Sequence, residues 1–235
     1  MLHAPYEHVG KRALDITVGT ILAVVAIPFI LVLAIGSAIA FRAWPIFVHR
    51  RTGRYGQPFP FPKIRSLPPT APPAADKYVI QLGVQANAYG RLLRRTHLDE
   101  LPQLFLVPFG LLSLVGPRPE MPQLAEKYSA SFAAARTRVR PGCTGLWQIS
   151  NASDGLIPEN PQYDEAYLDN LSFGLDLWVL VRSVRQLFGA PKIELHAVPT
   201  DLMKVRRVER RPELVPSVSA SDDAASHAPV SAISA

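Results

Sequence analysis

The chain has 235 residues, enough for one domain with its own core, and 48% of them are hydrophobic while only 19% are charged. Its single cysteine, Cys143, excludes an intramolecular disulfide, which fits a reducing compartment or a membrane protein that faces one. Although the net charge is +6, no stretch resembles a recognition helix, a zinc finger or an RNA-binding sheet, so no nucleic acid is expected as a partner.

Basic residues gather in the N-terminal half of the chain. Between Asp15 and Asp99 the sequence holds ten Lys and Arg residues but a single acid, Asp76. Such a zone attracts phosphates or acidic lipid headgroups, the latter at about 1 kcal/mol per basic residue near a bilayer surface. We therefore expect an anionic ligand or membrane lipid beside this part of the chain.

Residues 16–41 carry no charge and, as a helix rising about 1.5 Å per residue, exceed a hydrocarbon core of about 30 Å. Lys11 and Arg12 precede this run and Arg42 follows it, so both of its flanks are positive. The positive-inside rule keeps both flanks in the cytoplasm, and Pro28 near the middle can interrupt the helix. The sequence favours a re-entrant helix broken near Pro28, with a kinked spanning helix as the alternative.

A cleaved signal peptide is a further interpretation of the apolar run, because Lys11 and Arg12 form a basic start and residues 38–40 read Ala-Ile-Ala. The run is much longer than the usual ~7–15 apolar residues of such a peptide, which weighs against it. A signal-anchored binding protein with an exported domain is the related functional alternative. It predicts a C-terminus outside the cytoplasm.

Two short strands are expected next, over residues 45–50 and 59–64, joined by a turn at 53–56. Pro60 and Pro62 confine the second strand to a sheet edge, because proline cannot donate to the ladder.

Three helices are expected further along, over residues 89–95, 99–109 and 171–188. Apolar residues recur every three or four positions in the last, which suits either a helix on the bilayer surface or one packed on a core. The expected fold class is mainly α with a small β-hairpin. Its parts are an N-terminal membrane segment at 1–42, a compact domain at 43–190 and a largely disordered tail at 191–235.

Asp99 and Glu100 are adjacent carboxylates that follow a basic stretch. Neighbouring residues on a helix point about 100° apart, so this pair is suited to two separate roles rather than one shared proton. One carboxylate can act as a nucleophile, and the other can help to hold Mg²⁺. The structural alternative is a helix cap formed by Thr96 and Asp99.

Arg118 lies between Pro117 and Pro119, which restrict its backbone and suit it to hold a phosphate, or else to form a rigid solvated turn. Cys143 has no obvious histidine partner nearby, so packing is the expected role of its thiol.

Together these segments resemble the bacterial sugar transferases, the monotopic polyprenyl-phosphate phosphoglycosyl transferases, from Lys11 to about Phe188. The matching motifs are Lys11-Arg12-x-x-Asp15, Pro45-Ile-Phe47, Arg51-x-Gly53, Lys63-x-Arg65-Ser66, Leu92-x-Arg94-Arg95-Thr96-x-Leu98-Asp99-Glu100-Leu101-Pro102-Gln103-Leu104, Ser113-Leu-Val-Gly-Pro-Arg-Pro119, Arg140-Pro-Gly-x-Thr-Gly-Leu-Trp-Gln148, Tyr163-Asp164 and Leu175-Asp176-Leu177. The blocks around Asp99 and Arg118 are the most specific.

The resemblance implies a re-entrant helix and a catalytic domain lying on the cytoplasmic face of the bacterial inner membrane. It implies that Asp99 attacks the β-phosphate of a UDP-sugar, releases UMP and keeps a phosphosugar. Polyprenyl phosphate, usually undecaprenyl phosphate, then takes that group and begins an exopolysaccharide, an O-antigen or a glycoprotein glycan. Mg²⁺ would be held near Asp99 and Glu100. Residues implied to bind phosphates or to order the site are Lys63, Arg65, Arg95, Arg118 and Asp176.

Three positions depart from the family pattern. Ile27 stands where a serine usually precedes the proline, Leu111 where an acid is usual, and Ala152 where an arginine is usual. The last two keep open a non-catalytic membrane scaffold of the same fold, while the intact Asp99-Glu100 pair favours an enzyme. The sequence does not name the sugar, and it leaves a homodimer open.

Overall fold

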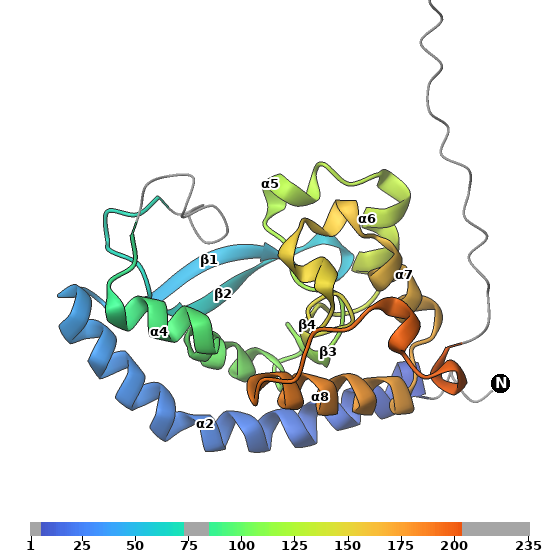
Figure 1. Ribbon diagram of the computed structural model, residues 1–235, viewed down its shortest axis with the longest axis horizontal. Coiled ribbons are helices and arrows are strands. Elements are labelled where there is room, and N and C mark those ends of the chain that lie inside the picture. The colour runs from blue at the N-terminus through green and yellow to red at the C-terminus, as the bar shows by residue number, and fades with distance from the viewer. Residues whose placement is uncertain (1–5, 73–84, 204–235) are drawn as a thin grey trace, which may run out of the picture. The chain divides into compact units, whose positions relative to one another are not determined.

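The computed structural model describes residues 6–72 and 85–203. Residues 1–204 belong to one compact unit, and its described part is mostly helical with a small antiparallel hairpin, as the sequence predicts. The α-helices and strands, many of them labelled in Figure 1, are α2 (Lys11–Phe41), β1 (Ile46–Thr52), β2 (Pro58–Ile64), α4 (Ala88–Thr96), β3 (Ser113–Val115), α5 (Pro122–Ala125), α6 (Ala130–Thr137), β4 (Gly142–Thr144), α7 (Gln162–Asp169) and α8 (Phe173–Leu187).

Helix α2 is the longest element, and it continues without interruption through Pro28. The expected break at this proline is therefore wrong at the level of the backbone. Proline removes one hydrogen bond and presses on the carbonyl four residues earlier, which bends a helix while the turns on either side stay bonded. Figure 1 accordingly shows α2 as one curved helix along the bottom of the view.

The first turns of α2 are fixed by buried polar contacts. The Asp15 carboxylate is 1% exposed and accepts hydrogen bonds from Ser113 Oγ and the Leu114 amide, both at 2.9 Å. Lys11 Nζ lies 2.6 Å from Asp176 Oδ2, and Asp176 is itself fully buried on α8. These bonds tie the start of α2 to strand β3 and to helix α8.

The last turns of α2 contact the same unit. Ser37 Oγ donates to the Arg65 carbonyl at 2.8 Å, and Tyr89 Oη donates to the Leu33 carbonyl at 2.7 Å. Gly36 lets these elements approach, because a Cβ there would lie 2.5 Å from Tyr89 Oη. Helix α2 is thus bound to one unit at both of its ends.

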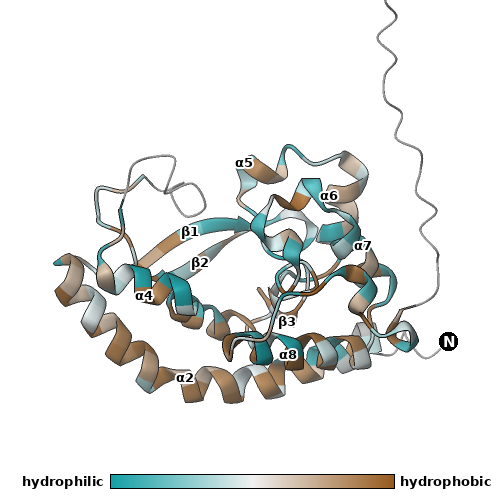
Figure 2. Cartoon of the chain, viewed as in Figure 1, coloured by the Kyte–Doolittle hydropathy of each residue, from teal (hydrophilic) through white to brown (hydrophobic). Residues whose placement is uncertain are grey.

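Between its ends, α2 exposes a continuous apolar surface. Val24, Phe29, Val32 and Ile35 are each more than half exposed, and Figure 2 shows this helix as largely hydrophobic. Among the described residues, α2 is the helix long and apolar enough to cross a membrane. Its inner face is packed, with Ala23 and Ala26 buried.

The hairpin pairs β1 with β2 antiparallel, from Ile46 opposite Ile64 to Thr52 opposite Pro58. Its prolines are tolerated because the sheet has two strands, so each strand has a free edge. Strands β3 and β4 form a second, parallel pair that the sequence did not reveal, since each has three residues.

Helix α8 confirms the helix expected at 171–188, and its packing on the core bears out one of the two interpretations of it. Leu175 and Val179 are buried in the core, whereas Leu177, Val181 and Val184 are about half exposed. The chain then continues into the core through Ile193 and Val198. A tail beginning at 191 is therefore wrong as far as residue 203, because these two apolar residues fix an otherwise polar stretch. Residues 204–235 of the expected tail lie outside the described residues.

Candidate active site

The carboxylate pair lines a pocket of about 180 Å³ that brings together five separate segments. Strands β1 and β2, helix α4, the turn that follows it and the loop after β3 each contribute side chains. The lining residues are Arg51, Lys63, Arg94, His97, Asp99, Glu100, Arg118 and Glu120.

A sharp turn between two helices presents the carboxylates. Helix α4 ends at Thr96, and His97 adopts a left-handed conformation with φ of 57°. The chain then enters η3 (Leu98–Leu106), so the helix expected at 99–109 is present as a shorter 3-10 helix. The predicted Thr96 cap is also wrong, because Thr96 Oγ1 donates back to the Leu92 carbonyl at 2.8 Å. Asp99 and Glu100 therefore occupy the first turn of η3.

Glu100 is held by two cations from other segments. Its Oε1 lies 3.1 Å from Lys63 Nζ and 3.3 Å from Arg118 Nη2. Lys63 is 5% exposed on β2, so the positive charge is largely shielded from water beside the carboxylate. Asp99, at 4% exposure, is equally sheltered on the same turn. Two carboxylates and several cations in one hollow form a site suited to phosphoryl groups.

Glu120 supports the wall of the pocket. Its carboxylate accepts hydrogen bonds from Arg51 Nη1, the Tyr128 hydroxyl and the Met121 amide, at 3.3, 3.3 and 3.0 Å. Burial raises the pKa of Tyr128 above its usual range, so this hydroxyl stays a donor. Glu120 thus has three donors of its own and serves as a structural acceptor.

The structure brings four of the predicted site residues to this pocket: Asp99, Glu100, Lys63 and Arg118. Arg94 lines it, whereas the predicted Arg95 does not and is exposed on α4. The sequence analysis missed Arg51, Arg94, His97 and Glu120. The double arginine of the motif signals a site but does not show which of its two side chains points inward.

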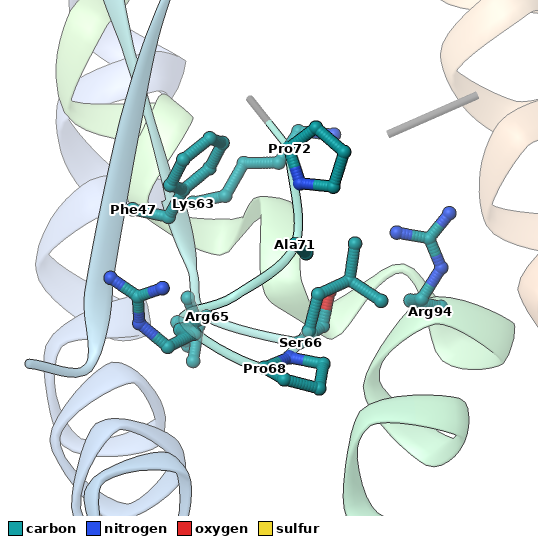
Figure 3. Close-up of a pocket in the computed structure, with 10 residues that line it drawn as sticks. Phe47, Lys63, Arg65, Ser66, Pro68, Ala71, Pro72 and Arg94 are labelled. Carbon is teal, nitrogen blue, oxygen red and sulfur yellow. The ribbon is translucent and has the colours of Figure 1, made fainter. Parts of the chain in front are cut away.

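Arg65 lies at a smaller neighbouring pocket of about 30 Å³ that shares Lys63 and Arg94 with the first. Its Nε donates to the Trp44 carbonyl at 2.8 Å. Figure 3 shows Arg65 and Arg94 on opposite sides of this hollow, one from the end of β2 and the other from α4.

Asp176 does not reach either pocket. It is fully buried and accepts hydrogen bonds from Tyr6 Oη, Lys11 Nζ and Tyr167 Oη at 2.6, 2.6 and 2.8 Å. Burial first, and then the Asp176 charge, raise the pKa of both tyrosines well above their ordinary value. In this structure Asp176 therefore joins α2, α7 and α8.

The two carboxylates of the pocket fit Mg²⁺ only as part of a shell that water and substrate phosphates complete. Among residues 6–72 and 85–203, no group of three or more His, Cys, Asp or Glu side chains could enclose a metal ion. Mg²⁺ is usually bound by one or two carboxylates, with water and substrate phosphates completing its shell. Asp99 and Glu100 on one pocket wall supply such a pair.

Two other residues singled out in the sequence lie outside the carboxylate pocket. Burial raises the pKa of the Cys143 thiol to about 12, which disfavours the thiolate that a cysteine nucleophile needs. Ala152 packs against the hydrophobic core in a 3-10 turn at Asn151–Asp154. Its side chain is not among those that line the pocket.

The family model of the bacterial sugar transferases matches residues 6–190 of this chain. Among its relatives, the exopolysaccharide production protein ExoY of Sinorhizobium fredii is 32% identical over 196 residues, which cover 77% of this chain and 86% of that protein.

Two longer relatives carry names that describe a reaction. The undecaprenyl-phosphate galactose phosphotransferase of Salmonella typhimurium is 32% identical over 201 residues, or 79% of this chain. The UDP-glucose:undecaprenyl-phosphate glucose-1-phosphate transferase of Klebsiella pneumoniae is 36% identical over 186 residues, or 75% of this chain. The matched regions are 40% and 39% of those two proteins, so the chain spans about two fifths of their length.

The protonated state of Cys143 gives a first prediction. At pH 8 its thiolate fraction should be about three orders of magnitude below that of a cysteine with the ordinary pKa of 9.0, because the raised pKa removes thiolate until the pH approaches 12. Alkylation by iodoacetamide, followed by mass spectrometry, should therefore be slow in the folded protein and fast after unfolding in detergent. Folded-state alkylation within tenfold of the unfolded rate would contradict the raised pKa of this thiol.

Proposed function

The chain belongs to the bacterial sugar transferase family, and we propose that it transfers a sugar 1-phosphate from a UDP-sugar to polyprenyl phosphate, with release of UMP. The observation that carries this proposal is the sheltered Asp99-Glu100 pair facing Lys63 and Arg118 in one pocket. The names of the Salmonella and Klebsiella relatives describe the same class of reaction on undecaprenyl phosphate.

In the first half of the proposed reaction, an Asp99 carboxylate oxygen attacks the β-phosphorus of the UDP-sugar. A new oxygen–phosphorus bond forms, and the bond from the β-phosphorus to the bridging oxygen breaks. The bridging oxygen leaves with the electron pair as part of UMP. Lys63 and Arg118 stabilise the charge that develops on the phosphoryl oxygens.

In the second half, a phosphate oxygen of polyprenyl phosphate attacks the same phosphorus. The bond to Asp99 breaks, the carboxylate is restored, and the product is a polyprenyl-diphosphate-sugar. A covalent intermediate lets a soluble donor and a lipid acceptor react in turn at one nucleophile, so they need not be bound together.

We propose that Asp99 and Glu100 hold Mg²⁺, which would neutralise part of the diphosphate charge when it is bound. Glu100 is held by Lys63 and Arg118, which fix its carboxylate on the pocket wall. In this proposal Asp99 is the nucleophile, and Glu100 is the carboxylate that orients Mg²⁺.

The two ends of α2 support a re-entrant placement in the bilayer. At ~1.5 Å per residue its 31 residues reach ~46 Å, beyond the ~30 Å of a hydrocarbon core. Yet both ends contact one unit, through Asp15 at the start and Ser37 at the end. We infer from these contacts that both flanks of α2 stay on the same side of the bilayer.

We therefore place the catalytic unit on the cytoplasmic face of the bacterial inner membrane. The exposed apolar surfaces of α2 and α8 face lipid, and the positive flanks of α2 remain in the cytoplasm. The resemblance to the exopolysaccharide production protein favours exopolysaccharide initiation as the pathway.

A non-catalytic scaffold of the same fold is the second candidate. The changes at Leu111 and Ala152 favour it, whereas the complete arrangement of Asp99, Glu100, Lys63 and Arg118 favours an enzyme. Activity that depends on Asp99 separates the two.

The direct test uses a membrane fraction with undecaprenyl phosphate, Mg²⁺ and a panel of UDP-sugars. The native protein should release UMP with one donor, and Asp99→Asn should lower that rate at least a thousandfold, because an amide is a poor nucleophile. Asp169→Asn, at a carboxylate near the end of α7 and outside the pocket, is the matched control and should keep the native rate.

Two outcomes of this assay would contradict the proposal. Release of UDP instead of UMP would mean direct glycosyl transfer. Native rates in Asp99→Asn would remove the proposed nucleophile.

Membrane placement can be tested with cysteines introduced at exposed positions on each side of α2. In inside-out vesicles, Val9→Cys and Trp44→Cys should both react with a membrane-impermeant maleimide, whereas in right-side-out vesicles neither should react. Ile27→Cys, in the middle of α2, should resist labelling in both. The slow native Cys143 serves as the internal background. Labelling of Val9→Cys and Trp44→Cys from opposite sides would establish a spanning helix instead.

A further inference from the structure

The loop that carries Arg118 is held by an unusual set of backbone contacts. Each of its four consecutive carbonyl oxygens, from Pro117 to Glu120, accepts a hydrogen bond, and the donors come from three segments: β4, α6 and β1. The donors are the Gly142 amide to Pro117 at 2.9 Å, Arg136 Nη2 to Arg118 at 2.8 Å, Arg51 Nη1 to Pro119 at 3.5 Å and the Thr52 amide to Glu120 at 2.8 Å.

Arg136 differs from the other donors because it binds the carbonyl of Arg118 itself. Its side chain is 7% exposed, and its Nε lies 2.7 Å from Asp164 Oδ2 on α7. The rings of Tyr128 and Phe132 flank its guanidinium, with centroids 5.0 and 5.5 Å from Cζ. Asp164 thus fixes the Nε edge of the planar Arg136 guanidinium, while Nη2 reaches the loop that carries Arg118.

A buried ion pair is a costly means of joining two helices. Taking both charges out of water costs several kcal/mol, and well-packed apolar residues often hold such a contact equally well. Burial first raises the pKa of Asp164, and the charge and hydrogen bond of Arg136 act in the opposite direction. What an apolar pair could not supply is the directed bond from Nη2 to Arg118.

We propose that Arg136, oriented by Asp164, is a positioning residue that fixes the Arg118 backbone and thereby keeps the Arg118 guanidinium beside Glu100. Pro117 and Pro119 restrict the dihedral angles next to Arg118 but do not set where the loop lies. The bonds from Gly142, Arg51 and Thr52 hold the loop on either side, and the Arg136 bond fixes the Arg118 carbonyl itself, from 18 residues away along the chain.

This inference rests on the proposed phosphosugar transfer for its catalytic consequence. Arg118 would stabilise charge as it develops on the phosphoryl group, so a displaced loop should lower the turnover rate more than it weakens donor binding. The guanidinium of Arg118 is 3.3 Å from Glu100, a separation that a shift of one ångström would disrupt.

The test is a double-mutant cycle with Arg136→Lys and Arg118→Ala. Lysine keeps a charge for Asp164 but lacks the planar fork that reaches two acceptors at once. We expect Arg136→Lys to lower kcat at least tenfold, with KM changed by less than threefold. In the Arg118→Ala background the same change should cost less than twofold, because the two residues act as a unit. Arg138→Lys, an exposed arginine two positions along, is the matched control and should have no effect.

A second readout does not depend on activity. Amide hydrogen exchange of the peptide containing Arg118 should accelerate at least tenfold in Arg136→Lys, while the β1–β2 hairpin exchanges as in the native protein. Asp164→Asn should change both readouts in the same direction by a smaller factor, and it replaces Arg136→Lys if that variant does not fold.

Equal losses from Arg136→Lys in both backgrounds, or unchanged exchange at Arg118, would overturn the positioning role. If the native protein releases no UMP, the proposed function fails, and the exchange measurement still decides whether Arg136 fixes the loop.

Discussion

The Asp15 carboxylate lies in the first turns of a largely apolar helix and is buried against the strand that leads to the loop carrying Arg118. Its bonds to Ser113 and Leu114 are matched at the far end of α2 by the bond from Ser37 to the Arg65 carbonyl. A carboxylate is removed from water only where donors replace its hydration, so these contacts fix α2 to one surface of the unit. The position of α2 relative to the rest of the unit depends on this attachment.

The residues that hold α2 lie close in sequence to two cations of the pocket. Strand β3, which Asp15 holds, continues within three residues into the segment that carries Arg118. Strand β2, whose end contacts Ser37 through Arg65, carries Lys63. The same contacts that hold α2 in place therefore also locate two cations of the pocket. In the proposed reaction, this places a site for a soluble nucleotide-sugar beside the surface from which a lipid phosphate arrives.

The sequence predicted much of this site because its chemistry is concentrated in long contiguous motifs. Asp99, Glu100, Lys63 and Arg118 converge on one pocket, as the motifs indicate. It could not choose between Arg94 and Arg95, because that choice depends on where α4 ends and how His97 turns the chain.

Motif membership also grouped Asp176 with the phosphate-binding residues, whereas the structure shows a buried link between α2 and α8. The role of Arg136 depends on a contact across 18 residues that has no local pattern. Pro28 predicted a break in the membrane segment, but α2 continues through it. Proline removes one backbone hydrogen bond, and the turns on either side keep theirs.

The most direct test of the central claim is intact-protein mass spectrometry after incubation with the active UDP-sugar and Mg²⁺ but without polyprenyl phosphate. The proposal predicts a gain in mass equal to one phosphosugar, located on the peptide that contains Asp99, together with a burst of UMP equal to the amount of enzyme. Adding polyprenyl phosphate should remove the adduct. Turnover that occurs only when both substrates are present, with no adduct and no burst, would contradict the covalent mechanism and assign Asp99 another role.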